Sequence, residues 1–326
     1  MNLGTRPILF LAGLALGVAF LFAALQGTNL WEVVHIVREH AHWKMVPLFF
    51  APYFIFFLLK SLRWRLLLEP YRRFPTLELL PLVLVGYAAN ILFPMQLGEV
   101  TRAYLAGRRF NTDAAPLLTS IALERVFDLL AVIVCFGIAL AVLETEVPAI
   151  RFVANIVAAA ALLGFAALAF YVWRTATVLA WADRVLQFVP ARLRQWLRTQ
   201  LEKGSRGLDA LRQAHRLGMI AAVSFTMWVV MAFCCLIALR TVEIEVGPVA
   251  AMFTLFCSVV GLALPTSPGF IGTIQIAFVV ALVPFGVDRA QALAASVYYN
   301  TLITVPALIV AAGILISGLV RSTLPK

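Results

Sequence analysis

Residues Pro94–Asp128 read PMQLGEVTRAYLAGRRFNTDAAPLLTSIALERVFD, and this stretch decides how the chain is organised. Two short motifs within it place five charged side chains beside or inside apolar runs: Glu99, Arg102, Glu124, Arg125 and Asp128. An ionisable group at membrane depth is costly, so it is usually buried in protein, paired and functional. The stretch therefore predicts a buried charge cluster.

The composition of the whole chain is that of a polytopic membrane protein. Of its 326 residues, 63% are hydrophobic and 13% are charged, whereas globular domains carry about 25% charged residues. The only extended non-apolar region runs from Arg174 to Arg216, and it is too short to form a second domain of ordinary size. We therefore expect a single membrane domain over residues 1–326.

The net charge of +10 comes from basic residues in short loops that flank apolar runs. The positive-inside rule accounts for this pattern, so membrane lipids, and no nucleic acid, are the expected anionic partners. The cysteines lie inside apolar runs without metal-ligand spacing, which predicts small core residues. They are Cys135, Cys234, Cys235 and Cys257.

Six apolar runs are predicted to cross the membrane, at roughly 20 residues per crossing. They are Pro7–Leu25, Val46–Leu59, Ala114–Leu143, Phe152–Trp173, Met219–Leu239 and Ala292–Leu319. Two more apolar segments, Leu77–Gly107 and Pro248–Phe285, are interrupted near their middles by proline and glycine. How these two segments are placed decides the topology.

The charges of the loops assign sides of the membrane. The basic segments Lys60–Thr76 and Arg174–Arg216 are expected in the cytoplasm, and the acidic loops near Glu144 and Glu243 outside. All loops fall on the side that their charge favours only if the two interrupted segments enter, turn and leave by the same side. Both segments are therefore predicted to be re-entrant helical hairpins.

The predicted fold class is an all-α integral membrane protein with six spanning helices, two re-entrant hairpins and an inverted-topology repeat. Repeat one covers about residues 1–143 and repeat two about residues 150–319. Both termini are expected in the cytoplasm, and a basic amphipathic linker at about residues 174–216 is expected on the cytoplasmic leaflet. Inverted repeats with broken helices at mid-membrane are typical of secondary transporters.

In the first hairpin, Pro94 and Gly98 interrupt the helix, so the returning helix should begin near Leu97. Glu99 lies three residues before Arg102 and can neutralise it on the same helix face. In the third crossing, Glu124 and Asp128 share a face and need a cation, which Arg102 or Arg125 could supply. This predicts a network of three acids and two arginines, either a transport site or a lock that stabilises the fold.

The second hairpin carries a similar break without charge, from Pro265 to Gly272. Two asparagines, Asn90 and Asn300, lie inside apolar helices and are expected to bond to neighbouring helices. The candidate substrate-binding residues are Asn90, Pro94, Gln96, Gly98, Glu99, Arg102, Glu124, Arg125, Asp128, Pro265, Ser267, Pro268, Gly269, Gly272 and Gln275. The sequence shows no catalytic motif, and we expect no cofactor and no metal.

These motifs, together with Arg63-Trp64 and Gly86, resemble those of the flippase-like transmembrane domain of the lysylphosphatidylglycerol synthase family. The chain resembles a stand-alone member of that family, without the soluble synthase domain. The resemblance covers the chain almost end to end and implies lipid translocation without lysyl transfer. It leaves the lipid open among phospholipids, aminoacylated phospholipids, hopanoids and polyprenyl-linked sugars. Relatives often have an arginine two residues before the Gly-Glu pair, where this sequence has Gln96.

The expected function is that of a non-enzymatic flippase for a polar-headgroup lipid in the bacterial inner membrane. The alternatives are a membrane-embedded lipid-modifying transferase and a scaffold subunit for a glycosyltransferase. A homo-oligomer and a lipid-modifying enzyme partner are both compatible with the sequence. The alternatives differ in what they require of the charge cluster, because a scaffold tolerates its neutralisation and a transporter does not.

Overall fold

The computed structural model describes residues 30–40, 43–93, 96–142, 213–262 and 267–317, with residues 21, 22, 25, 159 and 163 singly. Its elements, in chain order, are α2 (Leu30–His40), η1 (Trp43–Met45), α3 (Val46–Leu68), α4 (Thr76–Leu92), α5 (Leu97–Phe110), α6 (Ala114–Val142), α11 (Ala214–Thr241), α12 (Pro248–Leu262), η3 (Pro268–Phe270), α13 (Thr273–Leu282), η4 (Val283–Phe285) and α14 (Arg289–Ile316). This part of the chain holds helices and no strand, which confirms the all-α prediction.

Four stretches of the described residues are long and apolar enough to cross a membrane: Val46–Leu68, His215–Thr241, Pro268–Phe285 and Arg289–Ile316. Apolar side chains also point outward, since Ile309 and Ile316 on α14 are 66% and 73% exposed. Such a surface suits contact with lipid chains. The structure is that of a multi-pass membrane protein. The predicted crossings Pro7–Leu25 and Phe152–Trp173, and the linker at 174–216, lie outside the described residues.

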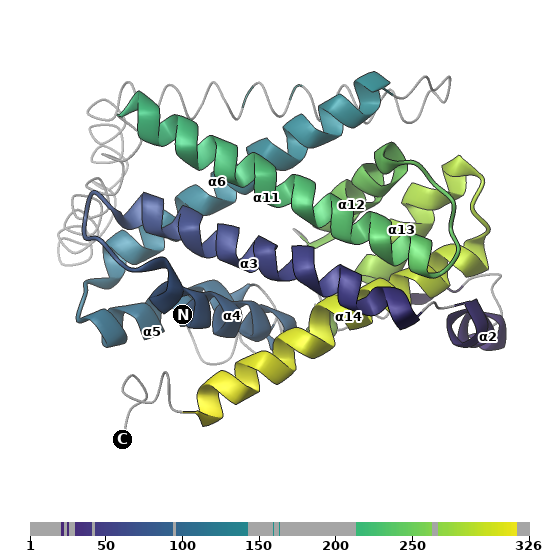
Figure 1. Cartoon of the computed structure of the whole chain (residues 1–326), viewed down its shortest axis with the longest axis horizontal. Coiled ribbons are helices and arrows are strands. Elements are labelled where there is room, and N and C mark those ends of the chain that lie inside the picture. The colour runs from purple at the N-terminus through teal and green to yellow at the C-terminus, as the bar shows by residue number, and fades with distance from the viewer. Residues whose placement is uncertain are drawn as a thin grey trace, which may run out of the picture.

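Helices α3 and α11 run alongside each other through the middle of the molecule (Figure 1). The first half of α3 is aromatic and packs on α14, where the Tyr53 hydroxyl donates to the Ile303 carbonyl at 2.6 Å. Helix α6 packs against both α3 and α11. These contacts place one face of α3 in the interior along its whole length.

The prediction that residues 60–76 form a loop is wrong for the first part of that segment, and the side of the membrane on which it lies stays a prediction. Helix α3 continues to Leu68, and it buries Lys60, Arg63 and Trp64 at 8%, 0% and 0% exposure. Trp64, which is expected at the membrane interface from its sequence neighbours, instead donates its indole N–H to Ser120 on α6 at 2.9 Å. The segment reads as a loop because its charges are basic, but their partners on α6 and α11 allow burial.

The segment predicted as the first hairpin forms two packed helices, α4 and α5, joined at residues 93–96. Their 17 and 14 residues correspond to about 25 and 21 Å, less than the roughly 30 Å of a hydrocarbon core. The helices approach closely at two glycines, because a Cβ on Gly98 would lie 1.9 Å from the Gly86 carbonyl oxygen. The lengths favour a segment that turns inside the membrane.

The segment predicted as the second hairpin forms α12, η3 and α13, and its two arms also pack on each other. Although Pro268–Phe285 is long enough to cross, its backbone turns sharply at Gly269 and Gly272, whose φ angles are 72° and 86°. Helix α13 itself has 10 residues. The break was predicted from the sequence, whereas the side from which the segment enters remains a prediction.

The turns of the two segments lie near each other. The α4–α5 and α12–α13 pairs occupy opposite parts of the long axis in Figure 1, yet the Gln96 amide approaches the Leu262 carbonyl to 3.5 Å, and η3 packs on α4. The two broken segments therefore contact each other. This contact agrees with the predicted topology. The six crossings, the re-entrant hairpins and the inverted repeat remain predictions.

Candidate functional site

The five charged side chains singled out in the sequence come together between α5 and α6. Arg102 of α5 binds Glu124 of α6 at 2.5 Å and Glu99 of its own helix at 3.0 Å. Arg125 of α6 binds Glu99 at 2.6 Å and Asp128 at 3.6 Å. Glu99 thus bridges the two arginines. The spacing of three residues within each helix places these partners on one face, as the sequence predicts.

A third arginine completes the network, although its position in the sequence predicted a loop. Arg63 of α3 donates to Asp128 at 2.6 Å and to the Ser224 hydroxyl of α11 at 3.2 Å. The network therefore contains three acids and three arginines from three helices, where two arginines were predicted. The Arg63-Trp64 pair, which is among the motifs that carry the family resemblance, was the sequence signal that could have found it.

Neutral side chains hold the charged ones in place. The Trp228 indole of α11 donates to Asp128 at 3.1 Å. Trp64 of α3 lies under Arg102, whose guanidinium carbon is 4.3 Å from the ring centroid. Such a cation–π contact is worth about 2 kcal/mol when both groups are desolvated. Trp64 thus positions Arg102, and Trp228 positions Asp128, on the side of the cluster that faces α3 and α11.

The cluster is sealed on one side and open on the other. Arg63 and Glu124 have no exposed surface and Arg102 keeps 1%, whereas the Arg125 side chain is 40% exposed. Lys60, one turn before Arg63 on α3, keeps 8% and interacts electrostatically with Arg125. Of the four cations, Arg125 is therefore the most open to a ligand and Lys60 the next.

Several buried polar atoms of the cluster have no hydrogen-bond partner among the described residues. They are the Nε and Nη2 atoms of Arg63, the Nε and Nη1 atoms of Arg102, the Nε atom of Arg125, Oε1 of Glu124 and Oδ1 of Asn90. Buried polar groups in native proteins are nearly always paired with protein, water or a ligand. Donors outnumber acceptors in this set, so the cluster favours an oxygen-rich partner.

The tip of the first hairpin contributes two of the predicted polar residues. Asn90 donates its amide N–H to Glu99 at 3.3 Å and so joins the cluster. Gln96 is exposed, adopts a left-handed conformation with φ of 53°, and approaches the second hairpin instead. Gly98 is buried at the crossing of α4 and α5. Pro94 lies outside the described residues.

The polar groups of the second tip are engaged locally. Ser267 donates to the Ile271 carbonyl at 2.5 Å, and the Gln275 side chain accepts the Gly272 N–H at 2.6 Å. Asn300 of α14 donates to the Gly269 carbonyl at 2.9 Å, as expected of a helix-to-helix partner. Pro268 begins η3, and Pro265 lies outside the described residues. These bonds stabilise the break, so a direct role in substrate binding for Ser267 and Gln275 remains a prediction.

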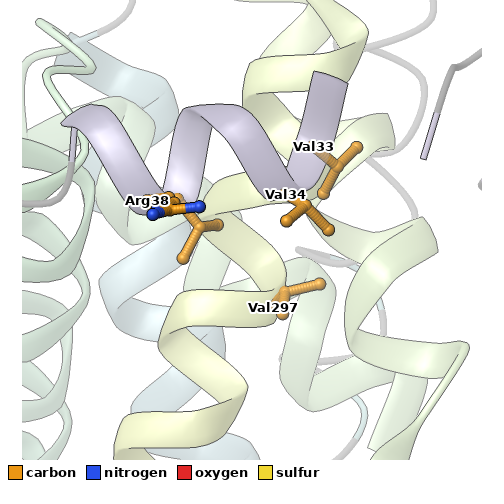
Figure 2. A pocket seen from close by; sticks show the side chains of 5 residues that line it. Val33, Val34, Arg38 and Val297 are labelled. Atoms are coloured by element: carbon orange, nitrogen blue, oxygen red, sulfur yellow. The ribbon is translucent and has the colours of Figure 1, made fainter. Parts of the chain in front are cut away.

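A separate apolar pocket of about 340 Å³ lies between α2 and α14. Figure 2 shows Val33, Val34 and Arg38 of α2 next to Val297 of α14, with Val37 completing the lining. None of these residues belongs to the charge cluster. Across the part of the chain that the structure describes, no group of three or more histidine, cysteine or acidic side chains is arranged to hold a metal, and the four cysteines are free thiols.

Comparison with known proteins agrees with the resemblance seen in the sequence motifs. Residues 10–311 match the profile of the family described as "Lysylphosphatidylglycerol synthase TM region". The chain is also 26% identical, over 333 aligned residues, to "Glycosyltransferase AglD" of Haloferax volcanii, with 90% of this chain and 52% of that protein covered. It thus spans about half the length of this curated relative. Because the family profile covers most of the sequence, the chain belongs to the lysylphosphatidylglycerol synthase transmembrane-region family.

Proposed function

We propose that the protein moves a polar-headgroup lipid between the leaflets of the bacterial inner membrane, with both termini in the cytoplasm. The observation that carries the proposal is the charge cluster of α3, α5 and α6, which adjoins the place where two broken helical segments meet. Broken segments that meet at membrane depth are where transporters hold polar cargo. The acyl chains would remain in the bilayer while the headgroup passes the cluster.

The geometry separates two tasks within the cluster. Arg102 is bound by two carboxylates and covered by Trp64, so it holds α5 to α6 and does not contact the cargo. Arg125 is bound by Glu99 and Asp128 but remains 40% exposed, so it can meet a headgroup phosphate. From the sequence, both arginines were predicted to be substrate-binding residues. Exposure now favours Arg125 for that task.

Leaflet exchange in proteoliposomes tests the proposal. Phosphatidylcholine vesicles with a trace of fluorescent phosphatidylglycerol should lose signal to an external quencher faster when the wild-type protein is present. Arg125→Gln should reduce the protein-dependent rate about tenfold, the effect of removing one charge-assisted contact of about 1.4 kcal/mol. Arg73→Gln is the matched control, because the Arg73 side chain is 83% exposed on the loop after α3 and far along the chain from α6.

One result would contradict transport, and a second would contradict the role of Arg125 alone. One is an exchange rate equal to that of protein-free vesicles for phosphatidylglycerol and for every other fluorescent lipid tried. The other is an Arg125→Gln rate indistinguishable from wild type while both proteins reconstitute equally. A reduced rate in Arg73→Gln as well would show that any loss of positive charge slows exchange, and would remove the support for Arg125.

A second candidate is a membrane scaffold that binds a glycosyltransferase. It is favoured by the relative that is named a glycosyltransferase and is about twice as long as the region that matches this chain. A scaffold needs the cluster only for folding. It therefore predicts that a charge-free, well-folded variant of the cluster keeps its partner, whereas the transport proposal predicts that the same variant no longer exchanges lipid.

A further inference from the structure

The charges of the cluster do not cancel. Its acids are Glu99, Glu124 and Asp128, and its arginines are Arg63, Arg102 and Arg125, which balance one another. Lys60 adds a fourth cation on the same face of α3 as Arg63, three residues away. The described part of the cluster therefore carries a net charge of +1. A surplus charge at membrane depth is costly unless a counter-ion neutralises it.

Lys60 is also the one cation of the cluster that forms no ion pair with a described carboxylate. Each arginine of the cluster has a carboxylate oxygen within 3.0 Å, whereas no carboxylate of the described residues lies within the 4.0 Å ion-pair distance of the Lys60 ammonium. The side chain is nevertheless 8% exposed, well inside the molecule. Because the three carboxylates of the cluster are already bound to arginines, none of the described residues pairs with Lys60, and an anionic ligand would neutralise it.

The hydrogen-bonding capacity of the surroundings points to the same kind of partner. Five buried arginine nitrogens lack an acceptor among the described residues, against two buried oxygens, Glu124 Oε1 and Asn90 Oδ1, that lack a donor. A phosphate offers several acceptor oxygens and a negative charge, and it suits both lysine and arginine. Of these five nitrogens only Arg125 Nε belongs to the open side of the cluster, and a neutral or cationic headgroup would leave it and the surplus charge unmet.

We propose that Lys60, with the open side of Arg125, binds the phosphate of a phosphodiester monoanion, so that the cluster selects anionic lipid headgroups over cationic or uncharged ones. This inference rests on the proposed function and names the cargo chemistry that it left open. The three acids then act as fixed partners for the arginines and do not carry a cationic headgroup. Lys60 sets the sign of the charge that the site accepts.

Equilibrium binding to the full purified chain in detergent tests this assignment. Phosphatidylglycerol should bind the wild-type protein, and Lys60→Gln should weaken that binding about tenfold, equal to about 1.4 kcal/mol. Lys60→Arg restores the charge and should bind within about threefold of wild type. Lys44→Gln is the matched control, because Lys44 is an exposed lysine just before α3 and should leave affinity unchanged. Uncharged diacylglycerol should show no dependence on Lys60.

The assignment is overturned if Lys60→Gln binds phosphatidylglycerol as tightly as wild type, or loses phosphatidylglycerol and diacylglycerol in equal measure. A measurement on the wild-type chain covers the case of a variant that does not fold. Saturating phosphatidylglycerol should slow the reaction of Lys60 with a water-soluble amine reagent at least fivefold, read by mass spectrometry, and diacylglycerol should not. An unprotected Lys60 at saturating phosphatidylglycerol also overturns it.

Competition with glycerol 1-phosphate distinguishes a site for a lipid phosphate from a site for a soluble phosphate. Its displacement of phosphatidylglycerol in a Lys60-dependent manner supports the phosphate site and identifies the part of the lipid that is bound. The two proposals can also fail separately. Lys60-dependent binding without leaflet exchange would leave the anion site and remove transport, whereas rapid exchange that ignores Lys60 would leave transport and remove the anion site.

Discussion

The two broken segments both interrupt a helix with a turn, but different groups stabilise the two turns. At the first, the turn between α4 and α5 leads into a helix whose charges bind α6 and α3. At the second, the turn between α12 and α13 is closed by uncharged groups, with Ser267 and Gln275 bonding to nearby backbone and Asn300 bonding from α14. The second tip is closed mostly by bonds among its own residues, with one from α14, whereas the charged groups after the first tip all pair across helices or within the cluster. A ligand that replaces protein groups as a binding partner is therefore better accommodated beside the turn between α4 and α5.

The largest expected difference concerns the glycines at the two helix crossings. A Cβ on Gly98 would lie 1.9 Å from a backbone oxygen, whereas a Cβ on Gly261 would lie 2.8 Å from the Thr273 methyl group, which belongs to a side chain. Gly98→Ala should therefore leave little folded protein, and Gly261→Ala should cost about 1–3 kcal/mol. The folded fraction and melting temperature in detergent measure both. Equal melting temperatures for the two variants would contradict the close approach of α4 and α5.

The next largest effect is expected from breaking a buried ion pair beside the first tip. Arg63→Met leaves the Asp128 carboxylate without its shortest partner, and removing one member of a buried pair costs about 3–5 kcal/mol. The double variant Arg63→Met with Asp128→Leu removes both charges and should recover much of that loss. Unfolding in denaturant distinguishes them. A double variant less stable than Arg63→Met would show that Asp128 stabilises the fold through its other partners, Arg125 and Trp228.

Removing a polar group at the second tip should have a smaller effect. Gln275→Ala deprives the Gly272 N–H of its acceptor, at a cost of about 1–3 kcal/mol for a buried unsatisfied donor. Because Gln275 is engaged in the break, we expect lower stability with an unchanged leaflet-exchange rate per folded molecule. A lower rate at normal stability would instead place Gln275 in contact with the cargo, as the sequence reading proposed.

The smallest effect is expected where the two tips touch. Gln96 approaches the Leu262 carbonyl at 3.5 Å, is exposed, and can bond to water when the contact is lost. Gln96→Ala should change the melting temperature by less than the Gln275→Ala variant, since an exposed hydrogen bond contributes at most about 0.5 kcal/mol. A large loss of exchange in Gln96→Ala with normal stability would show that this contact takes part in moving the tips.

Several features could be predicted from local sequence. The apolar runs predicted α6, α11 and α14 to within a few residues, because length and hydropathy are properties of one segment. Proline and glycine predicted both breaks, since they restrict or release the backbone where they stand. Spacing of three and four residues predicted that Glu99 faces Arg102 and that Glu124 and Asp128 share a face.

The sequence failed where the answer depended on another helix. Lys60, Arg63 and Trp64 were assigned to the cytoplasmic side because basic residues and tryptophan favour the interface. The burial of Arg63 and Trp64 needs Asp128, Ser224 and Ser120, which lie 56 to 161 residues away along the chain. No local pattern contains that information. The charge balance of the cluster, and with it the surplus at Lys60, was therefore invisible in the sequence.

The sequence by itself determined the class of protein, the positions of most helices, the two breaks and five members of the charge cluster, because hydropathy, backbone freedom and helical period act over short distances. Only the tertiary structure decided which carboxylate each arginine binds, that Arg102 is covered while Arg125 is open, and that α3 brings in Arg63 and Lys60. The physical reason is that the cost of a buried charge depends on the groups around it in space.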